Sequence, residues 1–137
     1  MMIGHKSSWC QKYTTQSFEN VTYYTSNDGL SHNEVTSIIK DKTGFLWIGT
    51  RGGLNCFDGT EFKVYDTEIG NKNSLIGSSI ESLYEDAKGQ IWIGTKTNGI
   101  SVYNPVHNKF THFNSASNGG NYIQGERIIS ITEGLPG

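Results

Sequence analysis

The sequence predicts an all-β fold in which a four-stranded unit occurs twice. The segment GFLWIGT at residues 44–50 returns as GQIWIGT at residues 89–95. Short runs rich in β-branched and aromatic residues surround both copies, and clusters of Gly, Asn and Asp separate these runs. The chain of 137 residues contains 17 Gly, 7 Tyr, 6 Phe and 3 Trp, a composition suited to turns and packed strands. A period of about 45 residues built from short strands is typical of the blades of a β-propeller.

Each repeat is expected to form four antiparallel strands. In the first repeat we place them at residues 34–40, 45–50, 54–58 and 61–66, and in the second at 79–85, 90–95, 99–104 and 109–114. Asp-Lys-Thr-Gly, Asp-Gly and related turn clusters separate neighbouring strands and favour tight hairpins. In the first copy, Leu46, Trp47 and Ile48 make both faces of one strand apolar, so this sheet needs a neighbour on each side.

The repeat also divides the chain. We expect a disordered lead-in at residues 1–17, the closing strand of a preceding or last blade within 18–28, a first blade at 29–73, a second at 74–121, and the start of a truncated third at 122–137. The flanking strands are predicted at residues 18–25 and 127–132. The predicted fold is therefore a β-propeller fragment: two complete four-stranded antiparallel blades plus a flanking strand at each end.

Charge and hydropathy exclude several classes of partner. The net charge is −2 and no basic run is present, so we expect no nucleic-acid binding. No apolar run is long enough to cross a bilayer, and the first residues show no apolar core of a signal peptide. Two cysteines, Cys10 and Cys56, are too few for a disulfide framework. Whether they pair stays open, since a bridge would need an oxidising compartment.

Nothing in the sequence predicts catalysis, a cofactor or a metal site. No serine lies in a Gly-x-Ser-x-Gly turn, and no nucleophile stands beside a base. The four histidines lack metal-ligand spacing. Only His32, in the loop that enters the first strand, is kept as a candidate functional histidine. Asp41-x-x-Gly44 and Asp86-x-x-Gly89 lack the alternating oxygens of a calcium loop, so we interpret them as turns.

The repeated residues are interpreted as structural. Trp47 and Trp92 are expected to fill the gap between adjacent blades, with stacking on a sugar ring as the alternative. Gly49 and Gly94 are expected to let neighbouring backbones approach closely. The turn residues complete this structural set: Asp41, Gly44, Asp86 and Gly89.

One end of the predicted blades offers a candidate ligand site. The loops after the second strand of each repeat, 51–53 and 96–98, should line one rim of a propeller. Arg51, Lys96 and Asn98 could there hydrogen-bond a polyhydroxylated or acidic ligand. The alternative is that they are solvated turn residues, because loops are usually polar.

At this level of detail the repeat resembles the two-component regulator propeller repeat. The family pattern runs Gly-Leu-Ser-x-Asn-x-Val-x-Ser-Ile, then Asp-x-x-Gly-x-Leu-Trp-Ile-Gly-Thr, then Gly-Gly-Leu and an aromatic-Asp pair. The first copy follows it from Gly29 through Asp58, and the second from Leu75 through Tyr103. The second copy departs at Ser74 and at Asn98, where the family has Gly.

The resemblance implies a sensor. In this family the repeats build the N-terminal periplasmic region of bacterial hybrid two-component system histidine kinases, which recognise oligosaccharides. The chain would then be a ligand-sensing portion truncated before the kinase, periplasmic in the parent receptor and not itself an enzyme. Its partners would be an oligosaccharide and the remaining blades, or another copy of the chain bound through open strand edges.

Two other functions stay open. One is a structural or protein-interaction propeller module, which the unpaired edge strands favour. The other is a fragment of a propeller-type lyase or hydrolase, for which Glu34, Glu81 and Glu126 at matching strand starts could converge on the axis. Because about three stacked repeats are usually needed for stability, we also expect the isolated chain to be marginally stable or to oligomerise.

Overall fold

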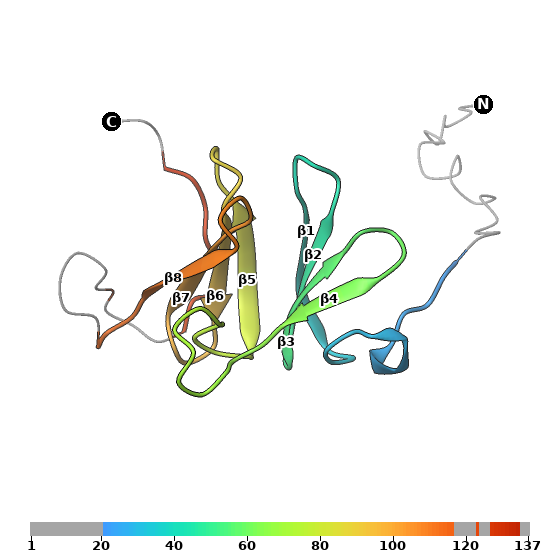
Figure 1. The fold of residues 1–137 in the computed structure, drawn as a ribbon, viewed down its shortest axis with the longest axis horizontal. Coiled ribbons are helices and arrows are strands. Elements are labelled where there is room, and N and C mark those ends of the chain that lie inside the picture. The colour runs from blue at the N-terminus through green and yellow to red at the C-terminus, as the bar shows by residue number, and fades with distance from the viewer. Residues whose placement is uncertain (1–20, 117–122, 124–126, 135–137) are drawn as a thin grey trace, which may run out of the picture.

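The structure is a computed structural model that describes residues 21–116, 123 and 127–134. Its strands form two antiparallel sheets, each with its four strands in chain order (Figure 1). The first sheet, or first blade, contains β1 (Val35–Lys40), β2 (Leu46–Thr50), β3 (Gly53–Phe57) and β4 (Phe62–Tyr65). The second blade contains β5 (Ile80–Glu85), β6 (Ile91–Thr95), β7 (Ile100–Asn104) and β8 (Lys109–Phe113). The all-β prediction of two four-stranded blades is confirmed. The lead-in at 1–17, Cys10 and Glu126 lie outside the described residues.

The two blades share their internal register. Ile39 pairs with Trp47 in the first blade as Tyr84 pairs with Trp92 in the second. Each first strand also carries an irregularity at the same place, between Val35 and Ser37 and between Ile80 and Ser82. An extra residue of this kind increases local twist, so both sheets twist alike.

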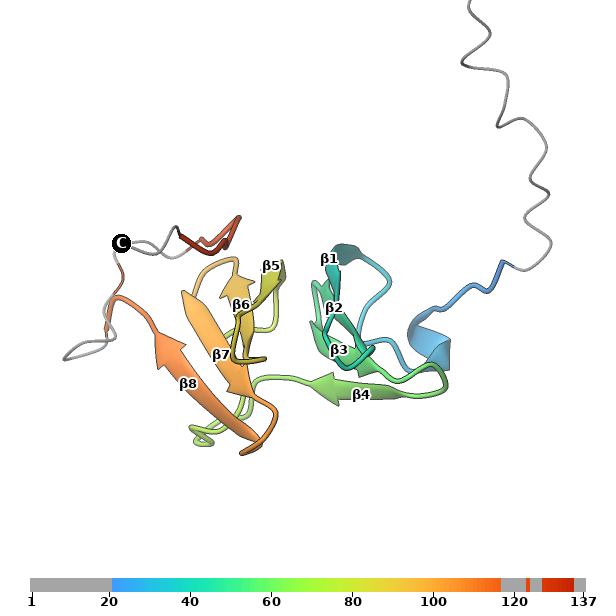
Figure 2. The same cartoon turned by 90° about the horizontal axis from the view of Figure 1, so that it is seen from above.

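The core lies between the blades. Figure 2 shows β1 and β5 facing each other while the outer strands of the two sheets diverge. One face of the first blade contributes Trp47 and Leu54, and the facing side of the second contributes Ile80, Leu83, Ile91, Ile93, Tyr103 and Phe110. Burial of this apolar surface is the main force that holds the two sheets together.

The opposite face of the first blade is only partly covered. Leu30, Ile48 and Phe57 form a small buried cluster there, and the ring of Tyr24 packs against Phe57. Ile38 on the same face remains 58% exposed. This side of the sheet therefore offers apolar surface that the described residues leave open.

The predicted flanking strands are absent from the described residues. Val21–Thr25 is not a strand and leads into a short 3₁₀ helix, η1 (Ser26–Asp28), capped by the Thr25 side chain. Residues 127–134 also form no strand, although the N–H of Ile128 donates to the carbonyl of Thr95 at 3.0 Å. A strand needs a ladder of backbone hydrogen bonds to a neighbour. Residues 127–134 contact the second blade through the Thr95 carbonyl and the side chains of Ser82 and Tyr84, which is not such a ladder.

Candidate functional site

The Asp-x-x-Gly turns hold the repeated tryptophans. One oxygen of Asp41 accepts from the N–H groups of Thr43 and Phe45 at 2.9 and 3.0 Å, and the other accepts from the Trp47 indole at 2.8 Å. Asp86 repeats the arrangement and accepts from the Trp92 indole at 2.9 Å. The turn role was expected from the sequence, whereas the bond to the tryptophan was not. The matching spacing from Asp to Trp in both repeats could have suggested it.

These hydrogen bonds change the acidity of both aspartates. Burial acts to raise the pKa of Asp41, but hydrogen bonds from Thr43, Trp47 and Phe45 outweigh it, so its pKa is lowered. The pKa of Asp86 is lowered in the same way, against burial, by Trp92, Gln90 and Lys88. Each carboxylate is therefore held ionised as a structural acceptor rather than poised for proton transfer.

The two tryptophans have matching partners in their own sheets and different surroundings beyond them. Trp47 stacks on Tyr65 of its own blade at 5.8 Å between ring centroids and also meets Tyr103 of the second blade at 5.6 Å. Trp92 stacks on Phe113 of its own blade at 5.6 Å and stays half-buried. Trp47 is only 3% exposed, so it fills the space between the blades and has no free ring face for a sugar.

β2 and β6 each carry a glycine where the next segment of the chain packs against the strand. A Cβ on Gly49 would lie 2.6 Å from the Ile80 methyl of β5, and one on Gly94 would lie 2.7 Å from the carbonyl oxygen of Ile128. Both sites require the absence of a side chain. Ile128 thus occupies the place on the second blade that Ile80 occupies on the first.

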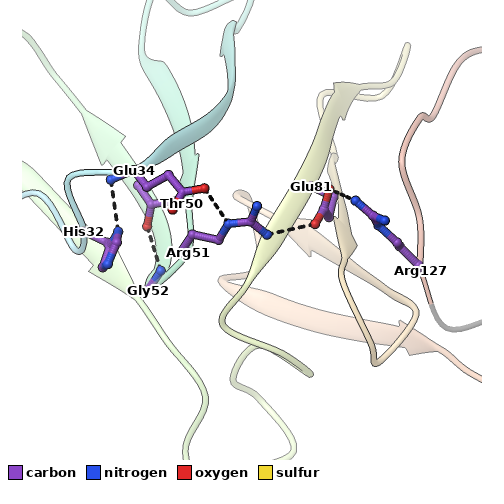
Figure 3. Close-up of polar contacts among 7 residues, drawn as sticks. All are labelled: His32, Glu34, Thr50, Arg51, Gly52, Glu81 and Arg127. Carbon is purple, nitrogen blue, oxygen red and sulfur yellow. Dashed lines mark hydrogen bonds and ion pairs between the residues drawn. The ribbon is translucent and has the colours of Figure 1, made fainter.

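Arg51 links the two blades at the predicted rim. Figure 3 shows its guanidinium between two carboxylates: Nε donates to Glu34 at 2.8 Å and Nη1 donates to Glu81 at 3.0 Å. Arg127 binds the other oxygen of Glu81 at 3.3 Å. Because the Glu81 side chain is only 12% exposed, its pair with Arg51 is screened less by solvent than a surface pair.

The structure places the other two rim residues at the same end of the blades. Arg51 lowers the pKa of Glu34 through its hydrogen bond and its charge, and the charge of Lys96 contributes in the same direction. The backbone N–H of Lys96 donates to the carbonyl of Ser79 as that of Arg51 donates to the carbonyl of Glu34, so the two cations occupy equivalent positions in the two blades. The exposed Asn98 accepts a hydrogen bond from Thr97 at 2.7 Å and lies over Gly77.

The histidine and the glutamates at this end have different roles from those considered in the sequence. His32 accepts from the backbone N–H of Glu34 at 3.0 Å through Nδ1, which orders the loop before β1. Val35 pairs with Thr50 as Ile80 pairs with Thr95, so Glu34 is equivalent to Ser79 and not to Glu81. The prediction that Glu34 and Glu81 occupy matching places at the strand starts is therefore wrong. The hypothesis of a propeller-type lyase or hydrolase rested on this match and loses that support.

A cleft of about 590 Å³ opens between the blades at the end opposite to the rim. Its walls come from the β1–β2 and β5–β6 turns and from Phe45, Tyr65, Cys56 and Val106. Burial raises the pKa of the Cys56 thiol to about 11, which leaves it protonated and unreactive at neutral pH. Sequence reasoning missed this cleft, because its walls come from loops far apart in the chain.

Comparison with known proteins supports the resemblance seen in the sequence. The description "two component regulator propeller" matches residues 29–52 and 74–97, which include both Asp–Trp units and the Gly49 and Gly94 positions. The chain carries two copies of the two-component regulator propeller repeat. The matched segments contain the first two strands of each blade, β1 and β2 in one and β5 and β6 in the other, and the start of the rim loop that follows.

Two relatives illustrate where such repeats occur. The extracellular domain of the putative hybrid two-component system BT3049 from B. thetaiotaomicron is 37% identical, with a TM-score of 0.62 over 68% of this chain. Histidine kinase P4 of Formosa agariphila is 57% identical over 42 residues, which is 31% of this chain. The chain spans only 13% of the first relative and 3% of the second. This chain is therefore similar to a small part of the extracellular domain of a putative hybrid two-component system.

Among the described residues, no helix combines the length and the apolar character that a membrane span requires.

Proposed function

We propose that this chain supplies blades of the extracellular, periplasmic ligand-sensing propeller of a two-component sensor histidine kinase. The observation that carries the proposal is the pair of repeat matches at residues 29–52 and 74–97, together with 37% identity to the extracellular domain of a putative hybrid two-component system. The internal packing supports it, because Trp47 and Trp92 have equivalent partners in successive blades. A propeller assembled in this way presents its loops at two ends, where ligands of such folds can bind.

The ligand proposed for the rim is an oligosaccharide, with acidic sugars preferred. Arg51 and Lys96 supply two cations at equivalent positions of the two blades, the charge of each favours ionised Glu34, and Asn98 adds an exposed amide. Arg51 already binds two carboxylates, so we expect it to attract an acidic sugar by its charge only. Lys96 and Asn98 would make the hydrogen bonds to the sugar. Planar carboxylates and sugar hydroxyls are suitable acceptors and donors for such groups.

Isothermal titration of the full chain against neutral and acidic oligosaccharides tests this proposal. Lys96→Ala should weaken binding of an acidic oligosaccharide about tenfold, the loss expected for one charge-assisted hydrogen bond. Lys109→Ala is the matched control, because Lys109 is exposed and lies in β8 at the other end of the blade. Equal losses in both variants, or binding by no member of the panel, would contradict the rim assignment.

A further inference from the structure

The cleft between the blades is built differently from the rim. Two cations and two anions line the cleft, so neither charge is in excess. They are Lys42, Lys88, Asp41 and Glu85. The Nζ of Lys42 donates to the carbonyls of Asp86 and Ala87 at 3.0 and 3.2 Å, and its backbone N–H donates to Glu85 at 3.0 Å. These bonds tie the β1–β2 turn of the first blade to the β5–β6 turn of the second and fix the mouth of the cleft.

The walls below this mouth are rich in carbon. Phe45 is 41% exposed and Val106 is 85% exposed, and both line the cleft together with Tyr65 and Pro105. Exposed apolar side chains that lie together at the edge of a cavity are typical of a ligand-binding surface. A volume of about 590 Å³ lies within the range of small-molecule sites.

The tyrosines supply a directional polar group inside the cleft. The Tyr65 hydroxyl donates to the Tyr103 hydroxyl at 3.1 Å, and the Tyr103 hydroxyl donates to the Asn108 side chain at 2.9 Å. With its proton committed, the Tyr65 oxygen retains acceptor capacity, and no described residue donates to it. A ligand hydroxyl could fill this position.

From these features we infer that the cleft is a second binding site, which takes a neutral aromatic molecule that carries a hydroxyl group. Its ring packs against Phe45, Val106 and the edge of Tyr65, and its hydroxyl donates to the Tyr65 oxygen. A charged ligand gains little where two cations and two carboxylates balance. The site does not depend on the proposed rim function, since it lies at the other end of the blades.

Titration of the full chain with 2-naphthol, followed through the indole ¹H–¹⁵N signals, tests the inference. Trp47 lines the cleft, whereas Trp92 makes the same hydrogen bond to an aspartate and does not line it, so Trp92 is an internal control. We expect a saturable shift of the Trp47 signal and a stationary Trp92 signal. Because the chain also contains Trp9, the variants Trp92→Phe and Trp9→Phe together assign the three indole signals.

Variants and a matched ligand sharpen the result. Val106→Asp should weaken 2-naphthol binding about fivefold or more, because it brings a charge to the apolar wall. Ile69→Asp, at a fully exposed position away from the cleft, should leave the affinity unchanged. Saturated decahydro-2-naphthol, which keeps the hydroxyl and loses the aromatic rings, should bind more weakly. Equal binding of the two ligands, parallel shifts of both indoles, equal effects of the two variants, or no saturable shift would each overturn the inference.

Discussion

Asp41 and Asp86 each join a turn to a tryptophan, so a single carboxylate fixes two features of the repeat. In each blade one oxygen holds the turn backbone and the other holds the indole N–H. Without this bond, the indole N–H of Trp47 would be buried with no acceptor. A buried donor left unpaired costs about 1–3 kcal/mol.

Asp41→Ala should therefore lower the free energy of unfolding by about 1–3 kcal/mol, measured by urea denaturation. Asp86→Ala should cost less, because the half-buried Trp92 can exchange its lost partner for water. Asp58→Ala, which removes a carboxylate from an exposed turn with no tryptophan bonded to it, is the control for loss of a turn residue. If Asp86→Ala proved costlier than Asp41→Ala, the buried indole would not be the cause.

The same carboxylates predict the acid limit of stability. Asp41 and Asp86 have pKa values below the ordinary 3.8 in the folded chain, so their ionised forms favour folding. Their contribution is complete above about pH 4 and is lost as the pH falls through the folded pKa values. Unfolding followed by tryptophan fluorescence between pH 7 and pH 2 should show stability falling below about pH 4. In Asp41→Asn this decline should be shallower, and an unchanged slope would contradict the assignment.

At the scale of the elements, close contact between β2 and β5 depends on Gly49. The Ile80 side chain of β5 lies where a Cβ on Gly49 would be, and Ile80 itself is fully buried. Since Gly94 and Ile128 repeat the contact, one glycine in β2 and one in β6 set how near the next segment can approach.

Gly49→Ala should destabilise the chain by about 1–3 kcal/mol, the usual cost of overpacking. In the background of Ile80→Ala, which removes the clashing methyl, the same substitution should cost measurably less. A double-mutant cycle in urea gives this coupling. A coupling energy near zero would show that the two strands do not meet as described.

The strands of both blades were predictable because β-branched and aromatic runs alternate with clear turn signals, and β2 and β6 begin only one residue after their expected starts. The flanking strands were not predictable, because residues 21–25 and 127–132 have strand-like composition but, in the part of the chain that the structure describes, form no ladder of backbone hydrogen bonds with another strand. The predicted equivalence of Glu34 and Glu81 was wrong for another reason. Both residues lie near the start of a first strand, but Glu81 lies two residues further along its strand than Glu34 does. Neither the Arg51–Glu81 pair nor the cleft could be predicted, since each joins residues from different blades.

At the scale of the whole molecule, the two faces of the fragment differ although their sequences repeat. Leu83 of the second blade and Ile38 of the first pair with Ile93 and Ile48 at the same place in their sheets. Leu83 is buried against the first blade, whereas Ile38 is 58% exposed on the open face. One position of the repeat thus serves as core in one blade and as surface in the other.

Leu83→Ala should cost about 2–4 kcal/mol, as expected for a buried leucine that leaves a cavity. Ile38→Ala, at the equivalent position, should cost less than about 1 kcal/mol, because its side chain is largely solvated. Both values come from the same denaturation experiment, so each variant controls for the other. Similar costs at the two sites would mean that the blades do not stack through the face described.

The central claim is that the two sheets stack with Trp47 between them, and a NOESY spectrum of the chain in solution tests it most directly. The account predicts cross-peaks from the Trp47 ring to Tyr65 within its sheet and to Tyr103 across the interface, and from Trp92 to Phe113 within its own sheet. Cross-peaks from Trp47 to Tyr65 without any to Tyr103 would show that the sheets fold but do not stack, and would contradict the account.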